Sequence, residues 1–221
     1  MDKLWDMLHA HLRPIFGRND ILKMKAVYIF ADKAHLGVFR EDGSKYITHP
    51  VQSVIIAIEA GERDLETLMA ILLHDVYEET QDKRYPKRFE HVRKQFGQLV
   101  AYRVHIMTKY DHTKEGKVIY WRGVRTCADH GVKKGKLADR THNIETLEEV
   151  PDPGRRKRKL KETVNEFIPI LTWLANDIEV KYYSLELERQ AERAIVRNLY
   201  LRLKKTMEGK YRIPFVVSEL D

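Results

Sequence analysis

The sequence predicts an all-α protein. Apolar residues recur at intervals of three and four along most of the 221-residue chain, which is the spacing that places them on one face of a helix. Convincing runs of alternating apolar and polar residues, which would indicate strands, are absent from the sequence. The helical pattern breaks most clearly between Pro151 and Gly154, the best candidate for a boundary. We nevertheless expect one packed unit over residues 1–221 rather than two domains.

The first helix is predicted over residues 2–13, is short and amphipathic, and ends near Pro14 and Gly17. Asn19 or Asp20 is the expected N-cap of the second, which runs to about Leu36, because short polar side chains accept hydrogen bonds from the first turn of a helix. The next segment, 37–48, is expected to be a loop.

The middle of the chain continues this helical pattern. Pro50 suits the first turn of a helix that Gly61 ends, and Asp64 starts a further helix that is expected to continue through Thr80. Further helices are predicted over about 87–95, 98–109, 118–128, 134–148, 155–175 and 178–208, with loops at 81–86 and 110–117 and an extended tail from Ile213.

Composition limits the compartment and the partners. A hydrophobic content of 43% is enough to build a core, and the single Cys127 excludes an internal disulfide. The N-terminus does not resemble a signal peptide, and no apolar run approaches the roughly 20 residues of a membrane span. We therefore expect a soluble cytoplasmic protein. The net charge of +7 favours anionic ligands such as nucleotides, polyphosphates or nucleic acid.

Two histidines and two aspartates form the strongest pattern in the sequence. His49 precedes a proline, His74 and Asp75 are adjacent, and Asp139 follows one helical turn before Asn143. Imidazole and carboxylate ligands together suit Mn²⁺, Fe²⁺, Zn²⁺ or Mg²⁺. The ordered set therefore predicts a site for one divalent metal.

Two glutamates follow the adjacent pair. If residues 72–80 are helical, His74 and Glu78 share one face, and Asp75 and Glu79 share a neighbouring face. Such an arrangement suits a metal-activated water beside a carboxylate that takes and returns its proton.

Several segments of the sequence match one known family. They are Ala34-His35, Arg40, Tyr46 to Pro50, Leu72 to Thr80, Phe96-Gly97, Thr108-Lys109, Lys136 to Asn143, and Lys161 to Thr163 with Phe167 to Pro169. Taken together, they resemble the HD-domain alarmone hydrolases, namely the hydrolase half of the bifunctional RelA/SpoT enzymes and the stand-alone small alarmone hydrolases. The resemblance covers about residues 20–178. It implies an HD-domain helical phosphohydrolase fold with the helices of about residues 155–208 packed on the core.

The resemblance also implies an activity and a set of roles. The family removes the 3′-pyrophosphate of ppGpp or pppGpp, usually with Mn²⁺. By resemblance, the metal ligands are His49, His74, Asp75 and Asp139, and the catalytic residues are Glu78, Glu79 and Asn143. The expected substrate-binding residues are Arg40, Glu41, Asp42, Lys45, Tyr46, Lys136, Asn143 and Thr146.

The sequence departs from the family pattern at three places. Glu79 stands where the family usually has Asp, and Lys45 replaces the usual Pro before Tyr46. Glu41-Asp42 replaces a Lys-Ser pair that helps to hold the guanine. Two carboxylates accept hydrogen bonds from guanine N1 and N2 or from adenine N6, so (p)ppApp-type nucleotides are expected alongside (p)ppGpp as candidate substrates.

Several residues have a structural interpretation beside a functional one. His35 either lines the site or belongs to the core, and His142 either packs or supports a metal ligand. Arg140 fits a structural ion pair, whereas Lys136 faces either phosphates or solvent. The basic run at 155–161 is expected to form a solvated face, since it has no interleaved aromatic residues to bind nucleic acid.

Two alternative functions stay open beside an alarmone hydrolase. One is a general HD-domain nucleotide phosphohydrolase, and the other is a non-catalytic module that binds an alarmone. A further hypothesis, which includes alarmone hydrolysis, is a functional pairing in which the protein destroys the product of a toxic alarmone synthetase. The long C-terminal helices are compatible with a homo-oligomer.

Overall fold

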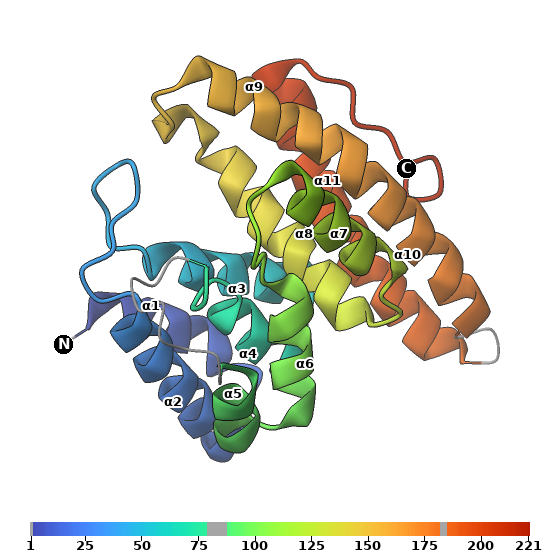
Figure 1. Cartoon of the computed structure of the whole chain (residues 1–221). Coiled ribbons are helices and arrows are strands. Elements are labelled where there is room, and N and C mark those ends of the chain that lie inside the picture. The colour runs from blue at the N-terminus through green and yellow to red at the C-terminus, as the bar shows by residue number, and fades with distance from the viewer. Residues whose placement is uncertain (1, 79–87, 182–184) are drawn as a thin grey trace.

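The computed structural model describes residues 2–78, 88–181 and 185–221, and within these ranges all regular elements are helices (Figure 1). The only strand-like contact in that part of the chain is an isolated bridge between Phe39 and Lys45. The predicted all-α class is therefore confirmed. In the same ranges no helix is long and apolar enough to cross a membrane.

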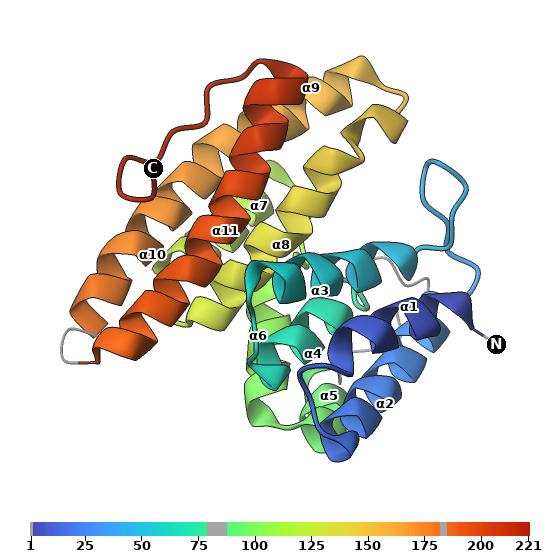
Figure 2. The ribbon, with the colours of Figure 1, turned by 180° about the vertical axis from the view of Figure 1, so that it is seen from behind.

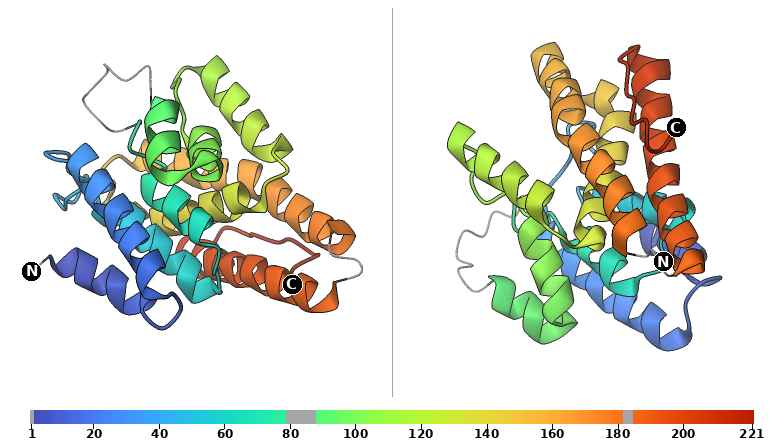
Figure 3. Two further views of the ribbon diagram at one scale, coloured as in Figure 1. Left: turned by 90° about the horizontal axis from the view of Figure 1, so that it is seen from below. Right: turned by 90° about the vertical axis from the view of Figure 1, so that its right-hand side faces the viewer.

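The helices form two neighbouring groups around one central helix. The first group comprises α1 (Lys3–Leu12), α2 (Arg18–Ala34), α3 (Thr48–Ala60), α4 (Leu65–Leu73), α5 (Arg88–Phe96) and α6 (Gln98–Met107). The second comprises α7 (Lys114–Thr126), α8 (His130–Glu145), the 3₁₀ turn η1 (Leu147–Glu149), α9 (Pro153–Glu162), the π turn η2 (Thr163–Phe167), α10 (Ile168–Lys181) and α11 (Glu186–Tyr211). Figure 3 shows α1 and α2 at the opposite end of the molecule from α10 and α11.

The central helix is α8. It packs against α3, α4, α6 and α11, and α11 in turn contacts α3 and α10 (Figure 2). Almost every residue of α8 is buried although the helix carries many charged side chains. Buried charges require partners, so a polar helix at the centre of the molecule indicates a functional site.

Several helix boundaries differ from those that the sequence predicts. α2 begins at Arg18 with Gly17 as its N-cap, so Asn19 and Asp20 lie in the first turn instead of capping it. There the carboxylate of Asp20 is favourably placed against the positive end of the helix dipole.

Two further differences concern the second half. α7 begins at Lys114, where Thr113 Oγ1 accepts a hydrogen bond from the Gly116 backbone, so much of the predicted 110–117 loop is helix. The helix predicted over 155–175 continues through η2 to Lys181, because no proline or glycine lies near residue 176 to stop it (Figure 1).

The helix that starts at Asp64 ends earlier than predicted. α4 stops at Leu73, and residues 74–78 form turns instead of a continued helix. Val76 and Glu78 donate their backbone N–H groups to carbonyls only three residues back, and Thr108 Oγ1 donates to the carbonyl of His74 at 3.1 Å. The argument that His74 and Glu78 share one helix face is therefore wrong.

A glycine allows α8 to approach its neighbours closely. A Cβ built on Gly131 would lie 2.6 Å from both Arg103 Cζ and Thr67 Oγ1. Arg103 cannot move easily, because its guanidinium bonds Asp64 Oδ2 at 2.5 Å and Asp129 Oδ1 at 3.1 Å.

Gly131→Ala is therefore expected to lower the free energy of unfolding by about 1–3 kcal/mol, since added volume in a packed site forces neighbours apart. Gly123→Ala is the matched control, because nothing lies within 4 Å of a Cβ at that helical position. The control should stabilise by roughly 0.5–1 kcal/mol through helix propensity. Denaturant midpoints of the three proteins measure both effects, and equal midpoints would contradict the close approach.

Candidate metal centre

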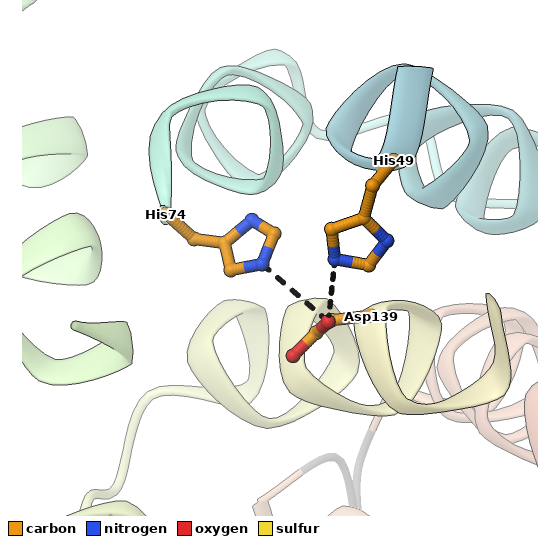
Figure 4. Close-up of side chains that lie close together, drawn as sticks. All are labelled: His49, His74 and Asp139. Carbon is orange, nitrogen blue, oxygen red and sulfur yellow. Dashed lines mark ion pairs between the residues drawn. The ribbon is translucent and has the colours of Figure 1, made fainter. Parts of the chain in front are cut away.

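Three side chains that are far apart in the sequence meet at one buried point (Figure 4). His49 comes from the first turn of α3, His74 follows the end of α4, and Asp139 lies in the middle of α8. One ligand atom from each lies within 4.8 Å of the others. Asp139 Oδ1 is 3.0 Å from His49 Nε2 and 3.5 Å from His74 Nε2.

The carboxylate of Asp75 also faces both histidines. Its Oδ1 is 3.2 Å from His74 Nε2, and its Oδ2 is 3.5 Å from His49 Nε2. Tyr46 donates its hydroxyl to Asp75 Oδ2 at 2.8 Å, which fixes the carboxylate. The structure thus brings together all four residues that the sequence assigned to a metal, and it places Tyr46 against one of them.

The electrostatics of this point favour a positive charge. Burial alone would lower the pKa of His74, but Asp75 and Asp139 raise it to about 10. Burial opposes ionisation of Asp75, yet His74 holds the pKa of that carboxyl well below its usual range. His74 Nε2 is buried, and among the described residues no acceptor is aligned to bond with it. A buried imidazole nitrogen that faces two carboxylates without an aligned hydrogen bond fits a divalent cation, and the mixed N/O donor set agrees with that.

Each imidazole is also held at its other nitrogen. His74 Nδ1 lies 2.7 Å from the carbonyl of Ile71, and His49 Nδ1 lies 2.8 Å from His142 Nδ1. Burial and the neighbouring His49 lower the pKa of His142 to about 3, so this ring is neutral. Such contacts orient a histidine toward a metal.

Asp139 binds further groups on its own helix. Lys136 Nζ lies 2.5 Å from Asp139 Oδ2, and Asn143 Nδ2 donates to Asp139 Oδ1 at 2.6 Å. Lys136 is buried, so it faces the site and not bulk solvent. Asn143 lies beside the expected ligand, one helical turn away as its spacing predicts.

Glu78 lies at the edge of this centre. Its carboxylate accepts a hydrogen bond from the backbone N–H of Lys109. Burial, followed by the charge of Asp75, raises the pKa of Glu78 to about 7. A carboxyl group that titrates near neutrality suits proton transfer. Glu79, the other expected catalytic glutamate, lies outside the described residues.

A cavity of about 560 Å³ opens above the centre. Its lining includes Asp75, Glu78 and Asp139 together with a large set of cationic side chains. These cations are Arg40, Lys109, Lys117, Lys136, Arg140, Arg155, Arg158 and Lys159. The walls also contain the aromatic rings of Phe39, Tyr46, Tyr120 and Trp121. Cationic and aromatic groups around one cavity fit a ligand that carries phosphates and a flat ring.

The basic run of α9 is not simply a solvated face. Arg155, Arg158 and Lys159 line the cavity, as does Glu162, which pairs with Arg140. Arg158, Lys159 and Glu162 follow Arg155 by three, four and seven residues, and this spacing places all four side chains on one face of the helix. This spacing is the sequence signal that could have identified them, whereas the composition of the run alone suggested a solvent-exposed surface.

The loop between α2 and α3 closes one side of the cavity. Arg40 donates to Thr146 Oγ1 at 3.0 Å, and Glu41 forms an ion pair with Arg155. Asp42 Oδ1 instead accepts bonds within its own turn, from the backbone N–H of Ser44 at 2.9 Å and its hydroxyl at 2.7 Å.

The remaining expected binding residue is not at the cavity. Lys45 is exposed and does not line it, so its expected role in binding lacks a geometric basis. It follows the turn and forms the isolated bridge with Phe39, which leaves its side chain in solvent. Phe39 itself lines the cavity and was not singled out from the sequence.

His35 is a buried histidine beside this site. It is 3% exposed, its ring lies 4.8 Å from that of Tyr46, and neither ring nitrogen has a hydrogen-bond partner in the described part of the chain. Burial lowers the pKa of His35 to about 4, opposed by Asp75 and assisted by His74 and His49.

This depressed pKa predicts a loss of stability at low pH. The unfolded chain binds a proton at His35 near pH 6.5, but the folded protein does so only near pH 4. Within that window the unfolded state binds more protons, so stability falls as the pH falls, by about 3 kcal/mol at most. His35→Phe should reduce the difference in unfolding free energy between pH 7 and pH 5, whereas His105→Phe at an exposed position should not. Equal pH dependence in all three proteins would contradict this assignment.

Fold and site together define a helical domain with a candidate site for a divalent metal, and comparison with protein families identifies the class. The chain belongs to the HD domain family, whose model matches residues 27–172. The resemblance to HD-domain proteins is thereby confirmed.

Individual relatives narrow the comparison. The chain is 32% identical to the bifunctional (p)ppGpp synthase/hydrolase SpoT of Escherichia coli over 99% of its own length and 31% of that protein. It is 35% identical to a guanosine-3′,5′-bis(diphosphate) 3′-pyrophosphohydrolase of Haemophilus influenzae over 81% of the chain and 26% of that protein. A GTP pyrophosphokinase of Streptomyces coelicolor is 31% identical over 85% of the chain and 24% of that protein. The chain therefore spans less than a third of the length of these relatives.

A solved structure shares the fold. It is described as a metazoan ortholog of SpoT that hydrolyzes ppGpp, and the match has a TM-score of 0.60. The match covers 85% of this chain and 95% of that chain at 23% sequence identity. At this level of identity the match supports the HD-type helical fold alone.

Proposed function

We propose that this protein is a metal-dependent alarmone hydrolase that removes the 3′-pyrophosphate of (p)ppGpp or of a related (p)ppApp-type nucleotide. The observation that carries the proposal is the buried meeting point of His49, His74 and Asp139 beneath a cavity lined by cationic residues. Such a cavity offers a metal position at its base and phosphate-binding groups on its walls.

The relatives support the same reaction. Two of them are named for hydrolysis of guanosine 3′,5′-bis(diphosphate) or of (p)ppGpp, and the solved neighbour is described as hydrolysing ppGpp. The Streptomyces coelicolor relative is named for the opposite reaction, synthesis. Glu78, with its pKa near 7, favours hydrolysis for this chain, because a water nucleophile needs a group that takes its proton.

The proposed roles follow from position. His49, His74, Asp75 and Asp139 would hold the metal, for which we propose Mn²⁺. When bound, the metal lowers the pKa of a water ligand and polarises a phosphoryl oxygen. Glu78 would take the proton of the attacking water, and Asn143 would hold Asp139 in place through their 2.6 Å hydrogen bond.

The cationic walls would hold the phosphates of the substrate. Lys109 and Lys117 lie on the α6–α7 side of the cavity, whereas Arg155, Arg158 and Lys159 lie on α9. Burial, then the nearby charge of Arg155, lowers the pKa of Lys159. Crowded cations of this kind are stabilised by a bound anion. An alarmone carries phosphates at two positions and so matches two cationic walls.

The base preference depends on the loop that precedes α3. Arg40 lines the cavity and presents a planar guanidinium, which stacks on a base or pairs with a phosphate. The ion pair with Arg155 partly neutralises Glu41 and leaves donor and acceptor groups side by side. Guanine and adenine both offer a complementary edge to such a pair. Thr146, which binds Arg40, would position it.

The decisive experiment is phosphate-product analysis of the purified protein with Mn²⁺ and ppGpp, pppGpp, ppApp or pppApp in turn. Release of pyrophosphate from any of them, lost in His74→Ala and retained in His105→Ala, is the expected result. The relative rates assign the base preference. If none of the four is hydrolysed while the protein binds Mn²⁺, the alarmone hydrolase is excluded. The broader nucleotide phosphohydrolase or a binding module then takes its place.

Cellular aspects of the proposal need separate tests. We propose a cytoplasmic enzyme of the small alarmone hydrolase type, whose homo-oligomeric state is open to measurement by light scattering. A pairing with a toxic alarmone synthetase predicts that co-expression rescues growth and that His74→Ala does not. Equal rescue by that variant would exclude the pairing.

A further inference from the structure

A third histidine, His142, contacts His49 on the side of its ring that faces away from the candidate metal position. His142 lies on α8, three residues after Asp139, and its ring centroid is 4.9 Å from that of His49. The two Nδ1 atoms are 2.8 Å apart, and the side chains are 8% and 1% exposed. At this separation the contact is a hydrogen bond, so one nitrogen carries a proton and the other offers its lone pair.

The direction of this bond follows from the other side of the His49 ring. Its Nε2 faces Asp139 Oδ1 at 3.0 Å and Asp75 Oδ2 at 3.5 Å, so Nε2 is the nitrogen directed at the metal position. A metal ligand needs a lone pair on that nitrogen, which leaves the single proton of the neutral ring on Nδ1. His49 Nδ1 must then donate, and His142 Nδ1 must accept.

His74, the other candidate imidazole ligand, also has a hydrogen-bond acceptor at its Nδ1, but this acceptor belongs to the backbone. His74 Nδ1 contacts the carbonyl of Ile71 at 2.7 Å, and a carbonyl oxygen only accepts. With a metal bound, His74 would therefore keep its proton on Nδ1, where the backbone accepts it, and would present Nε2 to the metal. His49 has no carbonyl in that role among the contacts of the described residues, and a side chain supplies the acceptor.

We propose that His142 is a positioning residue that holds His49 as the Nδ1–H tautomer, with the Nε2 lone pair directed at the metal. The inference rests on the metal-ligand part of the proposed function and is independent of the substrate. A hydrogen bond to the far nitrogen of a ligating histidine fixes its ring orientation, and its loss typically weakens metal binding about 10–100-fold.

Two substitutions of His142 test whether it acts as a hydrogen-bond acceptor for His49 or only fills space beside it. His142→Asn places an amide oxygen close to the position of the ring Nδ1, so it keeps the acceptor while it removes most of the ring. His142→Leu fills a similar volume without an acceptor. His105→Leu is the matched control, since His105 lies on the exposed side of α6 and its Nδ1 lies 3.0 Å from the Tyr110 hydroxyl, away from the metal centre.

The first readout is the dissociation constant for Mn²⁺, measured by titration of metal-free protein in the absence of nucleotide. His142→Leu is expected to bind Mn²⁺ about 10–100-fold more weakly, while His142→Asn and His105→Leu stay close to wild type. Wild-type affinity in His142→Leu would overturn the proposal. Equal weakening in His142→Asn and His142→Leu would also overturn it, because the ring volume would then matter instead of the acceptor.

The second readout is the ¹⁵N chemical shift of the His49 ring in wild-type protein and in His142→Asn, each loaded with a diamagnetic divalent cation such as Zn²⁺. A proton on Nδ1 in both is the expected result, and a proton on Nε2 in the wild type would overturn the proposal. This readout also decides the question if His142→Leu fails to fold. Neither measurement uses a nucleotide, so a failure of alarmone hydrolysis leaves both outcomes interpretable.

Discussion

Replacement of Asp139 by alanine is expected to abolish Mn²⁺ binding and hydrolysis together. Asp139 Oδ1 faces His49 Nε2 and His74 Nε2 at 3.0 and 3.5 Å, so its carboxylate joins the two imidazoles into one site. A bound metal supplies several kcal/mol of transition-state stabilisation, and its loss should reduce kcat/KM to roughly a thousandth or less.

The same substitution is expected to lower stability. Lys136 is buried and loses its carboxylate partner at 2.5 Å, and Asn143 loses its acceptor. Removal of one member of a buried ion pair costs about 3–5 kcal/mol. Asp139→Asn is therefore the second variant, because it keeps the volume and a hydrogen-bonding oxygen while it removes the charge.

The measurements are metal titration, phosphate release and denaturant unfolding on the same preparations. Asp177→Ala provides a matched control, since Asp177 also pairs with a histidine, His130, at 2.7 Å but lies away from the cavity. A folded Asp139→Asn protein that bound Mn²⁺ as tightly as the wild type would show that this carboxylate is not a ligand.

Replacement of Glu78 by glutamine is expected to separate metal binding from catalysis. Glutamine has nearly the same shape, and its carbonyl oxygen still accepts the bond that Lys109 donates to Glu78. It cannot take a proton from water. Loss of a general base typically lowers the rate about 10²–10⁴-fold, whereas Mn²⁺ affinity should change little.

Glu162→Gln tests whether the loss of any negative charge in the cavity lowers the rate while Mn²⁺ affinity changes little. Glu162 lines the cavity but is paired with Arg140, so its substitution should affect kcat less than that of Glu78. The comparison requires kcat at saturating substrate and an independent Mn²⁺ titration. Normal turnover by Glu78→Gln would remove Glu78 from the proposed mechanism.

The sequence was a good guide wherever a property is local. Helical periodicity predicted the all-α class, and Gly61 ends α3 in a left-handed conformation at φ 112°, where glycine is favoured. Asp64 caps α4 as its position predicts, since its side chain accepts from the Glu66 backbone N–H. These features depend on neighbours within one turn of the chain.

Prediction was poorer where a distant segment decides the outcome. The sequence predicts a continuous helix through residues 72–80, but α4 ends at Leu73 and the carbonyl of His74 accepts a hydrogen bond from Thr108, 34 residues away in sequence. The basic run of α9 looked like a solvated face, yet part of it lines the cavity because α9 lies across from the loop that holds Glu41.

The sequence by itself determined the fold class, the HD-type family resemblance and the identity of the four candidate ligands, because residue type and order carry that information. Only the tertiary structure decided that His142 contacts His49, that Tyr46 holds Asp75, and which cations of α9 face the cavity. The physical reason is distance along the chain. A side-chain contact between residues separated by tens of positions depends on how helices pack, and local spacing does not encode packing.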